Sequence, residues 1–232
     1  MFRISQYMRE LAKAEATGQY PVVRDRKATG PVVIWNLIRR CNLTCKHCYA
    51  LSADHDYAGE LGTQEVYTVM DDLRTFGVPV LILSGGEPLM RPDLFDIAAR
   101  AQGMGFYIGL STNGTLIDEP MADRVTAAGF DYVGISLDGL KPTHDKFRRL
   151  DGAFDRSLAA VRFLGARGVK VGLRFTMTSM NAHDLPALLA LMREEGAQKF
   201  YFSHLNYAGR GNVRSAQIQY RKDKHGQRKR SA

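Results

Sequence analysis

Three cysteines lie within eight residues of one another, in the segment Cys41-Asn42-Leu43-Thr44-Cys45-Lys46-His47-Cys48, and the chain has no other cysteine. An odd number packed this tightly does not predict a disulfide framework; it indicates a metal or redox centre. Three thiolates can hold three irons of a 4Fe-4S cluster, which normally takes four cysteine ligands. The remaining iron would then be open to a further ligand, as a centre that binds substrate requires.

A zinc site is the alternative. Cys41, Cys45 and Cys48 with His47 or His55 would make a Cys₃His set, a combination that zinc accepts. Zinc modules usually draw their ligands as two separated pairs, and this chain has one compact group. The spacing therefore favours the cluster.

Short polar segments follow several apolar runs. In Ser84-Gly85-Gly86-Glu87-Pro88, two glycines allow close approach of a ligand to the backbone, and the carboxylate can accept bonds from an ammonium group. Short polar side chains can converge on ribose hydroxyls from two further segments, Ser111-Thr112-Asn113-Gly114 and Ser136-Leu137-Asp138-Gly139. The Asn-Gly and Asp-Gly pairs within them are also common turn signals. Arg174 and Thr176, two apart, face one side of a strand. The Arg174 guanidinium suits a carboxylate, with a surface ion pair as the alternative.

Helices and strands alternate along residues 31–205. Amphipathic segments end at Gly77, Gly103, Gly129, Gly168 and Gly196, and a glycine there stops a helix in the left-handed conformation. With an opening strand at 32–37, the predicted strands are 80–83, 106–110, 132–137, 169–175 and 200–202. Six strands alternating with helices predict a parallel sheet, either an open doubly wound sheet or a partial βα barrel. The polar segments would share its carboxyl-end face.

The cysteine spacing after the first strand, with Gly85-Gly86-Glu87-Pro88 after the second, resembles the radical S-adenosylmethionine superfamily. The resemblance implies a parallel partial (βα)6 barrel in which the open iron chelates the amino and carboxylate groups of S-adenosylmethionine. It implies that Glu87 holds the methionine amino group and that His47, where the family usually has an aromatic residue, lies against the adenine. The expected cofactor-binding set is His47, Gly85, Gly86, Glu87, Asn113, Ser136, Asp138 and Arg174. No catalytic residue is expected beyond the cluster ligands, and His144, Asp145 and Arg148, which match an HDxxR segment, are expected to organise their loop.

Segments 2–11, 41–50, 84–90 and 203–211 resemble the superfamily members that act in haem d1 biosynthesis. The resemblance implies reductive cleavage of S-adenosylmethionine and hydrogen abstraction from a sirohaem-derived tetrapyrrole that loses propionate side chains. An external electron donor such as flavodoxin or ferredoxin would serve it. A peptide-modifying enzyme of the same superfamily and a non-catalytic iron-sulfur or zinc-binding fragment are the alternatives. Those members usually continue into a cysteine-bearing C-terminal region, so the chain is expected to be C-terminally shortened.

Composition completes the expected organisation. Residues 1–30 are a helix (4–16) and lead-in, 31–208 the core domain, and 209–232 a basic tail expected to be disordered. The net charge is +8, of which +6 comes from the residues after Gly211, so the body is nearly balanced and no nucleic-acid partner is expected. No signal peptide and no apolar run of membrane-spanning length is recognisable, which leads us to expect a cytoplasmic protein with no membrane partner.

Overall fold

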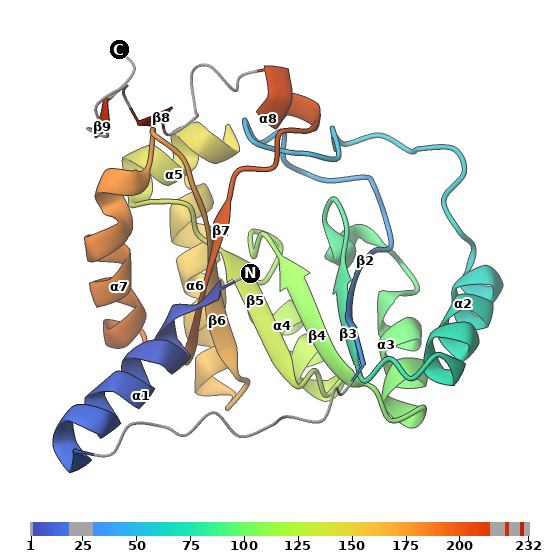
Figure 1. The fold of residues 1–232 in the computed structure, drawn as a ribbon. Helices are drawn as coiled ribbons and strands as arrows, with labels where there is room; N and C mark the ends of the chain where they lie inside the picture. The colour runs from blue at the N-terminus through green and yellow to red at the C-terminus, as the bar shows by residue number, and fades with distance from the viewer. Residues whose placement is uncertain (1, 19–29, 214–220, 223–227, 230–232) are drawn as a thin grey trace.

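Six parallel strands, in the spatial order of the chain, form an open half-barrel (Figure 1). The computed structural model describes residues 2–18, 30–213, 221–222 and 228–229. The parallel strands are β2 (Val32–Asn36), β3 (Val80–Ser84), β4 (Tyr107–Thr112), β5 (Tyr132–Ser136), β6 (Val171–Met177) and β7 (Lys199–His204). A short strand that the sequence did not predict, β1 (Phe2–Arg3), pairs antiparallel with β7 at the sheet edge. The predicted partial (βα)6 barrel is confirmed.

Within the described residues, helices α2 to α7 lie on one side of this sheet (Figure 1). The α-helices are α1 (Ile4–Thr17), α2 (Thr63–Thr75), α3 (Leu94–Gly103), α4 (Glu119–Ala127), α5 (Lys141–Arg148), α6 (Ala153–Ala166), α7 (Leu185–Glu194) and α8 (Gly209–Val213), with 3-10 turns at Pro88–Met90 and Ala182–Asp184. Two helices, α5 and α6, separate β5 from β6, where the sequence pattern indicated one. The pair β8 (Arg221–Lys222) and β9 (Arg228–Lys229) forms a separate antiparallel ribbon.

Glycines end the helices much as predicted. Gly77, Gly129, Gly168 and Gly196 all have positive φ, which a glycine adopts without the steric cost of a Cβ. The α3 helix differs, because Gly103 is its last residue and the left-handed glycine is Gly105, with φ 78°. The helix therefore ends at Gly103 as predicted, and the left-handed turn follows two residues later.

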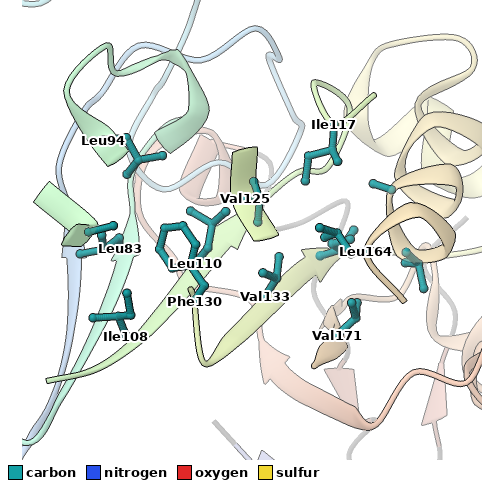
Figure 2. Close-up of a cluster of buried hydrophobic side chains, with 14 of the residues drawn as sticks. Leu83, Leu94, Ile108, Leu110, Ile117, Val125, Phe130, Val133, Leu164 and Val171 are labelled. Carbon is teal, nitrogen blue, oxygen red and sulfur yellow. The ribbon is translucent and has the colours of Figure 1, made fainter. Parts of the chain in front are cut away.

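The hydrophobic core lies between the outer face of the sheet and the helices (Figure 2). Leu83, Ile108 and Leu110 from the strands are fully buried, as are Leu94 of α3 and Leu164 of α6. Truncating one such leucine or isoleucine to alanine typically costs about 2–5 kcal/mol of unfolding free energy. This packed layer fixes the strands, and through them the loops at the strand ends.

The inner face of the sheet carries a different set of residues, since successive side chains of a strand point to opposite sides. Its carboxyl end is edged by short polar side chains, and the strand register places Asn36 beside Ser84 and Thr176 beside Ser203. Larger polar side chains lie nearer the amino end, among them Tyr107 and Lys199. The inner face therefore offers polar groups at two levels.

The ends of the chain extend the predicted organisation. Helix α1 spans 4–17, against a predicted 4–16, and residues 19–29 of the lead-in lie outside the described part. Helix α8 begins at Gly209, the residue at which the predicted tail starts. The prediction of disorder falls largely on residues 214–220, 223–227 and 230–232, which also lie outside it. Among the described residues, no helix combines the length and the apolar character needed to cross a bilayer.

Candidate active site

A cavity of about 340 Å³ opens at the carboxyl ends of the strands. It is lined by all three cysteines and by His47, Gly85, Gly86, Asn113, Ser136 and Arg174. Of the residues that the sequence predicted for the site, only Glu87 and Asp138 do not line it. The loops that follow β2, β3, β4 and β5 thus converge as parallel strand ends should.

The cysteine loop follows β2 and folds back on itself. Cys41 donates its backbone N–H to Ala53 O at 3.1 Å, and the Cys41 sulfur accepts a bond from the Leu43 N–H at 3.4 Å. Cys41 and Cys45 are buried, Cys48 is half-buried, and all three are free thiols. Burial raises the pKa of the Cys41 thiol to about 12. Metal binding must therefore displace the protons, as it does whenever thiolate is the ligand.

The segment after β3 lies directly against the cysteine loop. Gly86 donates its backbone N–H to Ile38 O at 2.6 Å, and Glu87 donates its own to Arg40 O at 2.9 Å. A Cβ on Gly86 would overlap the carbonyl oxygens of Arg39 and Arg40. This close approach of two backbones explains why glycine stands here.

Glu87 is fully buried behind the cavity wall. Its carboxylate accepts bonds from the Thr112 hydroxyl (2.7 Å), the Asn113 N–H (2.8 Å) and the Leu89 N–H (3.2 Å). Burial raises the pKa of this carboxyl to about 7, against the opposing effect of those hydrogen bonds. As arranged here, Glu87 ties the β3 loop to the β4 loop, and its contact with a cofactor stays a prediction.

Asn113 connects the β4 loop to the cysteines. Its side-chain amide donates to Asn42 Oδ1 at 2.9 Å and lies 4.0 Å from the Cys41 sulfur, while its oxygen accepts bonds from Thr115. The Ser157 hydroxyl of α6 donates to the Asn113 carbonyl at 2.8 Å. The predicted site residue is therefore held from several sides.

Asp138 is also fully buried, and it organises two residues that line the cavity. Its carboxylate pairs with the Arg148 guanidinium and lies 3.7 Å from His47 Nε2. Arg148 reaches on to the Cys45 sulfur at 3.6 Å, and its Nε is buried with no hydrogen-bond partner in the part of the chain that the structure describes. The resemblance assigned Arg148 only a role in organising its loop. Its place four residues after His144, on one face of a helix, was the available signal.

His47 lies in the cavity wall, where the resemblance expected an aromatic ring. Its ring stacks on Phe147, with centroids 4.5 Å apart and planes inclined by 19°. Burial lowers the pKa of His47 to about 4, and its Nδ1 has no hydrogen-bond partner in the described residues. A neutral, flat ring with a spare nitrogen suits contact with a heteroaromatic ligand.

Helix α8 holds the far side of the cysteine loop, which the sequence did not predict. Arg210 donates from Nε to Cys45 O at 2.7 Å and from Nη2 to Ser52 O at 2.8 Å. Its backbone N–H donates to Cys48 O at 2.9 Å. Gly209, with φ 54°, lies against the carbonyls of Cys48 and Tyr49. In Figure 1, α8 lies beside the loop that follows β2. A lone arginine beside a glycine in a basic segment gave no sign of this contact.

His144 supports the site in its neutral form, and its titration can be tested. Its Nδ1 accepts the Asp138 N–H at 2.9 Å, and burial lowers the pKa of His144 to about 3. In the unfolded chain a histidine gains a proton below about pH 6.5. The contribution of this group to stability is therefore complete above that pH and is lost as the pH falls toward 3.

At pH 5 we expect this histidine alone to have cost about 2 kcal/mol of unfolding free energy relative to pH 7. H144N, which keeps an acceptor near the Nδ1 position, should show a smaller loss between the two pH values in urea unfolding of the metal-free protein. H55N, at an exposed histidine, is the control and should follow the wild type. Equal pH dependence in H144N and wild type would contradict the expectation.

The donor set of the cavity fits an iron-sulfur cluster in its chemistry. Three cysteine sulfurs line one cavity, and the Arg148 and Asn113 side chains approach two of them. In the described part of the chain, no three His, Cys, Asp or Glu side chains lie close enough to share a single metal ion. A cluster, in contrast, takes its cysteines on separate irons.

Comparisons with known proteins point to one family. Residues 35–192 match the Radical SAM superfamily. The chain is 53% identical, over 215 residues, to a pre-heme d1 synthase of Dinoroseobacter shibae, covering 91% of this chain and 51% of that protein. It is 49% identical, over 189 residues, to an Fe-coproporphyrin III synthase of Methanosarcina barkeri, covering 82% of this chain and 47% of that protein. The chain thus spans about half the length of these relatives.

Solved structures share the fold of this chain. Streptococcus suis SuiB bound to S-adenosylmethionine superposes with a TM-score of 0.67 at 14% sequence identity, covering 98% of this chain and 48% of that one. At that identity the likeness concerns the fold alone. The match to residues 35–192, together with the relatives above, shows the family: the chain belongs to the radical SAM superfamily.

Proposed function

We propose that the chain binds a 4Fe-4S cluster through Cys41, Cys45 and Cys48 and uses it to cleave S-adenosylmethionine reductively. The observation that supports this most is the convergence of the three thiols with the Gly85-Gly86 backbone on one cavity at the carboxyl end of the half-barrel. Three thiolates leave one iron without a protein ligand. That vacancy is where the amino and carboxylate groups of the cofactor would bind.

When bound, the cluster would supply one electron to the sulfonium of S-adenosylmethionine, giving methionine and a 5′-deoxyadenosyl radical that takes a hydrogen atom from the substrate. The chain positions both molecules. The bare backbone at Gly85 and Gly86 admits the methionine end, with Glu87 as the predicted partner of the amino group. Asn113 and Ser136 line the wall on which the ribose would lie, with Asp138 behind it.

His47 is the group we assign to the adenine, because its neutral ring is already held flat by Phe147. Arg148 places its charge between the Cys45 sulfur and Asp138. A cation at that sulfur stabilises the thiolate form that binds iron. Each of these side chains acts by binding or orienting, as expected of a protein whose cofactor carries out the chemistry.

We further propose that the substrate is a sirohaem-derived tetrapyrrole that loses propionate side chains on the route to haem d1. The 53% identity to a pre-heme d1 synthase and the 49% identity to an Fe-coproporphyrin III synthase support a tetrapyrrole. An external donor such as flavodoxin or ferredoxin would supply the electron.

The proposal is tested by anaerobic reconstitution with iron and sulfide, followed by incubation with S-adenosylmethionine and dithionite. We expect about four irons per chain and equal amounts of 5′-deoxyadenosine and methionine. A sirohaem-derived tetrapyrrole should raise the yield. Stimulation by a peptide and indifference to tetrapyrroles would favour a peptide-modifying enzyme. Bound zinc without cleavage would instead favour a non-catalytic fragment and overturn the proposal.

A further inference from the structure

A second cavity, of about 570 Å³, lies on the inner face of the sheet, nearer the amino ends of the strands. Its size is in the range of small-molecule sites. The side chains that line it are Val32, Ile34, Val80, Ile82, Tyr107, Tyr132, Arg174, Lys199 and Tyr201. Two of these are cationic, and none of the described lining residues is acidic.

The cationic side of this cavity is formed by β6 and β7. Burial lowers the pKa of Arg174, and within the described residues no hydrogen bond or ion pair reaches its guanidinium. Lys199 Nζ lies 3.4 Å from the Tyr107 hydroxyl and 4.6 Å from the centroid of the Tyr132 ring. The half-buried Arg174 guanidinium has no carboxylate partner among the described residues, so an anion bound beside it would be favourable.

Glycines on the inner face allow these side chains to lie along the sheet. A Cβ on Gly134 would be 2.8 Å from Arg174 Cδ and 2.9 Å from the Tyr132 hydroxyl. A Cβ on Gly172 would be 2.6 Å from that hydroxyl and 2.8 Å from Lys199 Cβ. The Arg174 stem and the Tyr132 ring therefore occupy space that a larger residue at position 134 or 172 would fill.

The opposite side of the cavity, formed by β2 and β3, is apolar. Val32 is 60% exposed and Ile34 is 50% exposed, although both lie within a strand. An apolar wall facing a pair of cations suits a ligand with a large apolar face and carboxylates at its edge. Arg174 and Ile34 line the cysteine cavity as well, so a ligand here would reach toward the cofactor.

We propose that Arg174 and Lys199 bind a carboxylate side chain of the substrate while its apolar face lies against Val32 and Ile34. This inference rests on the proposed function, because a tetrapyrrole with propionate side chains has that chemistry. It moves Arg174 from the methionine carboxylate, its expected partner, to the substrate. The assignment also agrees with Arg174 lining both cavities.

The test is direct binding of iron coproporphyrin III, a porphyrin with four propionates, to the purified chain. Trp35, the only tryptophan, lies in β2, and quenching of its fluorescence reports binding. We expect R174Q and K199Q each to raise the Kd about tenfold, since each removes a charged partner of a carboxylate. R174K should recover part of the loss. R156Q, at an exposed arginine on α6, is the matched control and should bind like wild type.

The outcomes separate the two proposals. An unchanged Kd in R174Q and K199Q, with thermal melts showing that both are folded, overturns the inference, and so does failure of the wild type to bind the porphyrin. A raised KM for S-adenosylmethionine in R174Q with unaltered porphyrin binding returns Arg174 to the cofactor and also overturns it. Absence of S-adenosylmethionine cleavage in the reconstituted wild type overturns the proposed function, while porphyrin binding still decides the inference.

Discussion

Replacing Cys41, Cys45 and Cys48 together by alanine is expected to lower the iron content after reconstitution from about four per chain to the background level. Cleavage of S-adenosylmethionine should fall to the rate of the reaction without protein, because no other cysteine can take over the irons. Iron and sulfide assays, the visible absorbance of the cluster and the yield of 5′-deoxyadenosine measure the effect. Continued cleavage by the triple variant would refute the assignment of all three ligands.

The matched control is H55A, since His55 is one of the two histidines that a zinc site would use. The residue is exposed, and its ring lies tilted against Tyr57 with centroids 4.0 Å apart. We expect H55A to keep its iron and its cleavage activity. The triple variant should stay folded, because the loop also depends on backbone bonds such as Lys46 N–H to Phe147 O at 2.9 Å. Loss of iron in H55A would point to a histidine ligand.

G86A is expected to have the second-largest effect. The added methyl group would overlap two backbone carbonyls, so the loop after β3 must move away from the cysteine loop. Overlap with backbone cannot be relieved by rotating a side chain, and we expect a loss of about 3 kcal/mol of unfolding free energy, at the upper end for overpacking. Cluster retention should fall as well, because the Gly86 N–H bond to Ile38 O would be lost.

The same substitution at Gly165 is the control. Gly165 lies in α6, and a Cβ there would meet nothing within 4 Å. G165A should therefore stabilise the protein by about 0.5–1 kcal/mol, the usual gain of alanine over glycine in a helix. Urea unfolding of both variants measures the difference. If G86A unfolds at the same urea concentration as wild type, the close approach of the two loops is not what keeps glycine at this position.

Much of the fold could be predicted from the sequence because local signals are strong in this chain. Apolar runs, five of them after a helix-ending glycine, placed all six parallel strands to within two residues at either end. The same signals could not decide between an open sheet and a partial barrel, because closure depends on twist and tilt along the whole sheet. Strand β1 was not predicted, because a strand of two residues is too short to show an alternation of apolar and polar side chains.

The site was predictable where it lies in contiguous motifs. The cysteines, Gly85 and Gly86 line the cavity because each follows its strand directly. Arg148 and Arg210 could not be assigned to it, since they reach Cys45 from 103 and 165 residues away in the chain. Nor could the burial of Glu87 be foreseen, because it depends on Thr112 and Asn113 from the next strand.

The contact between α8 and the cysteine loop sets an order of events during translation. The ribosome releases Cys48 long before Arg210, so the loop is made without the three hydrogen bonds that Arg210 later donates to it. Iron that reached the nascent chain before Arg210 emerged would meet a looser loop than iron that arrived afterwards. The hydrogen bonding of the cysteine loop is therefore complete only once this single arginine has been synthesised.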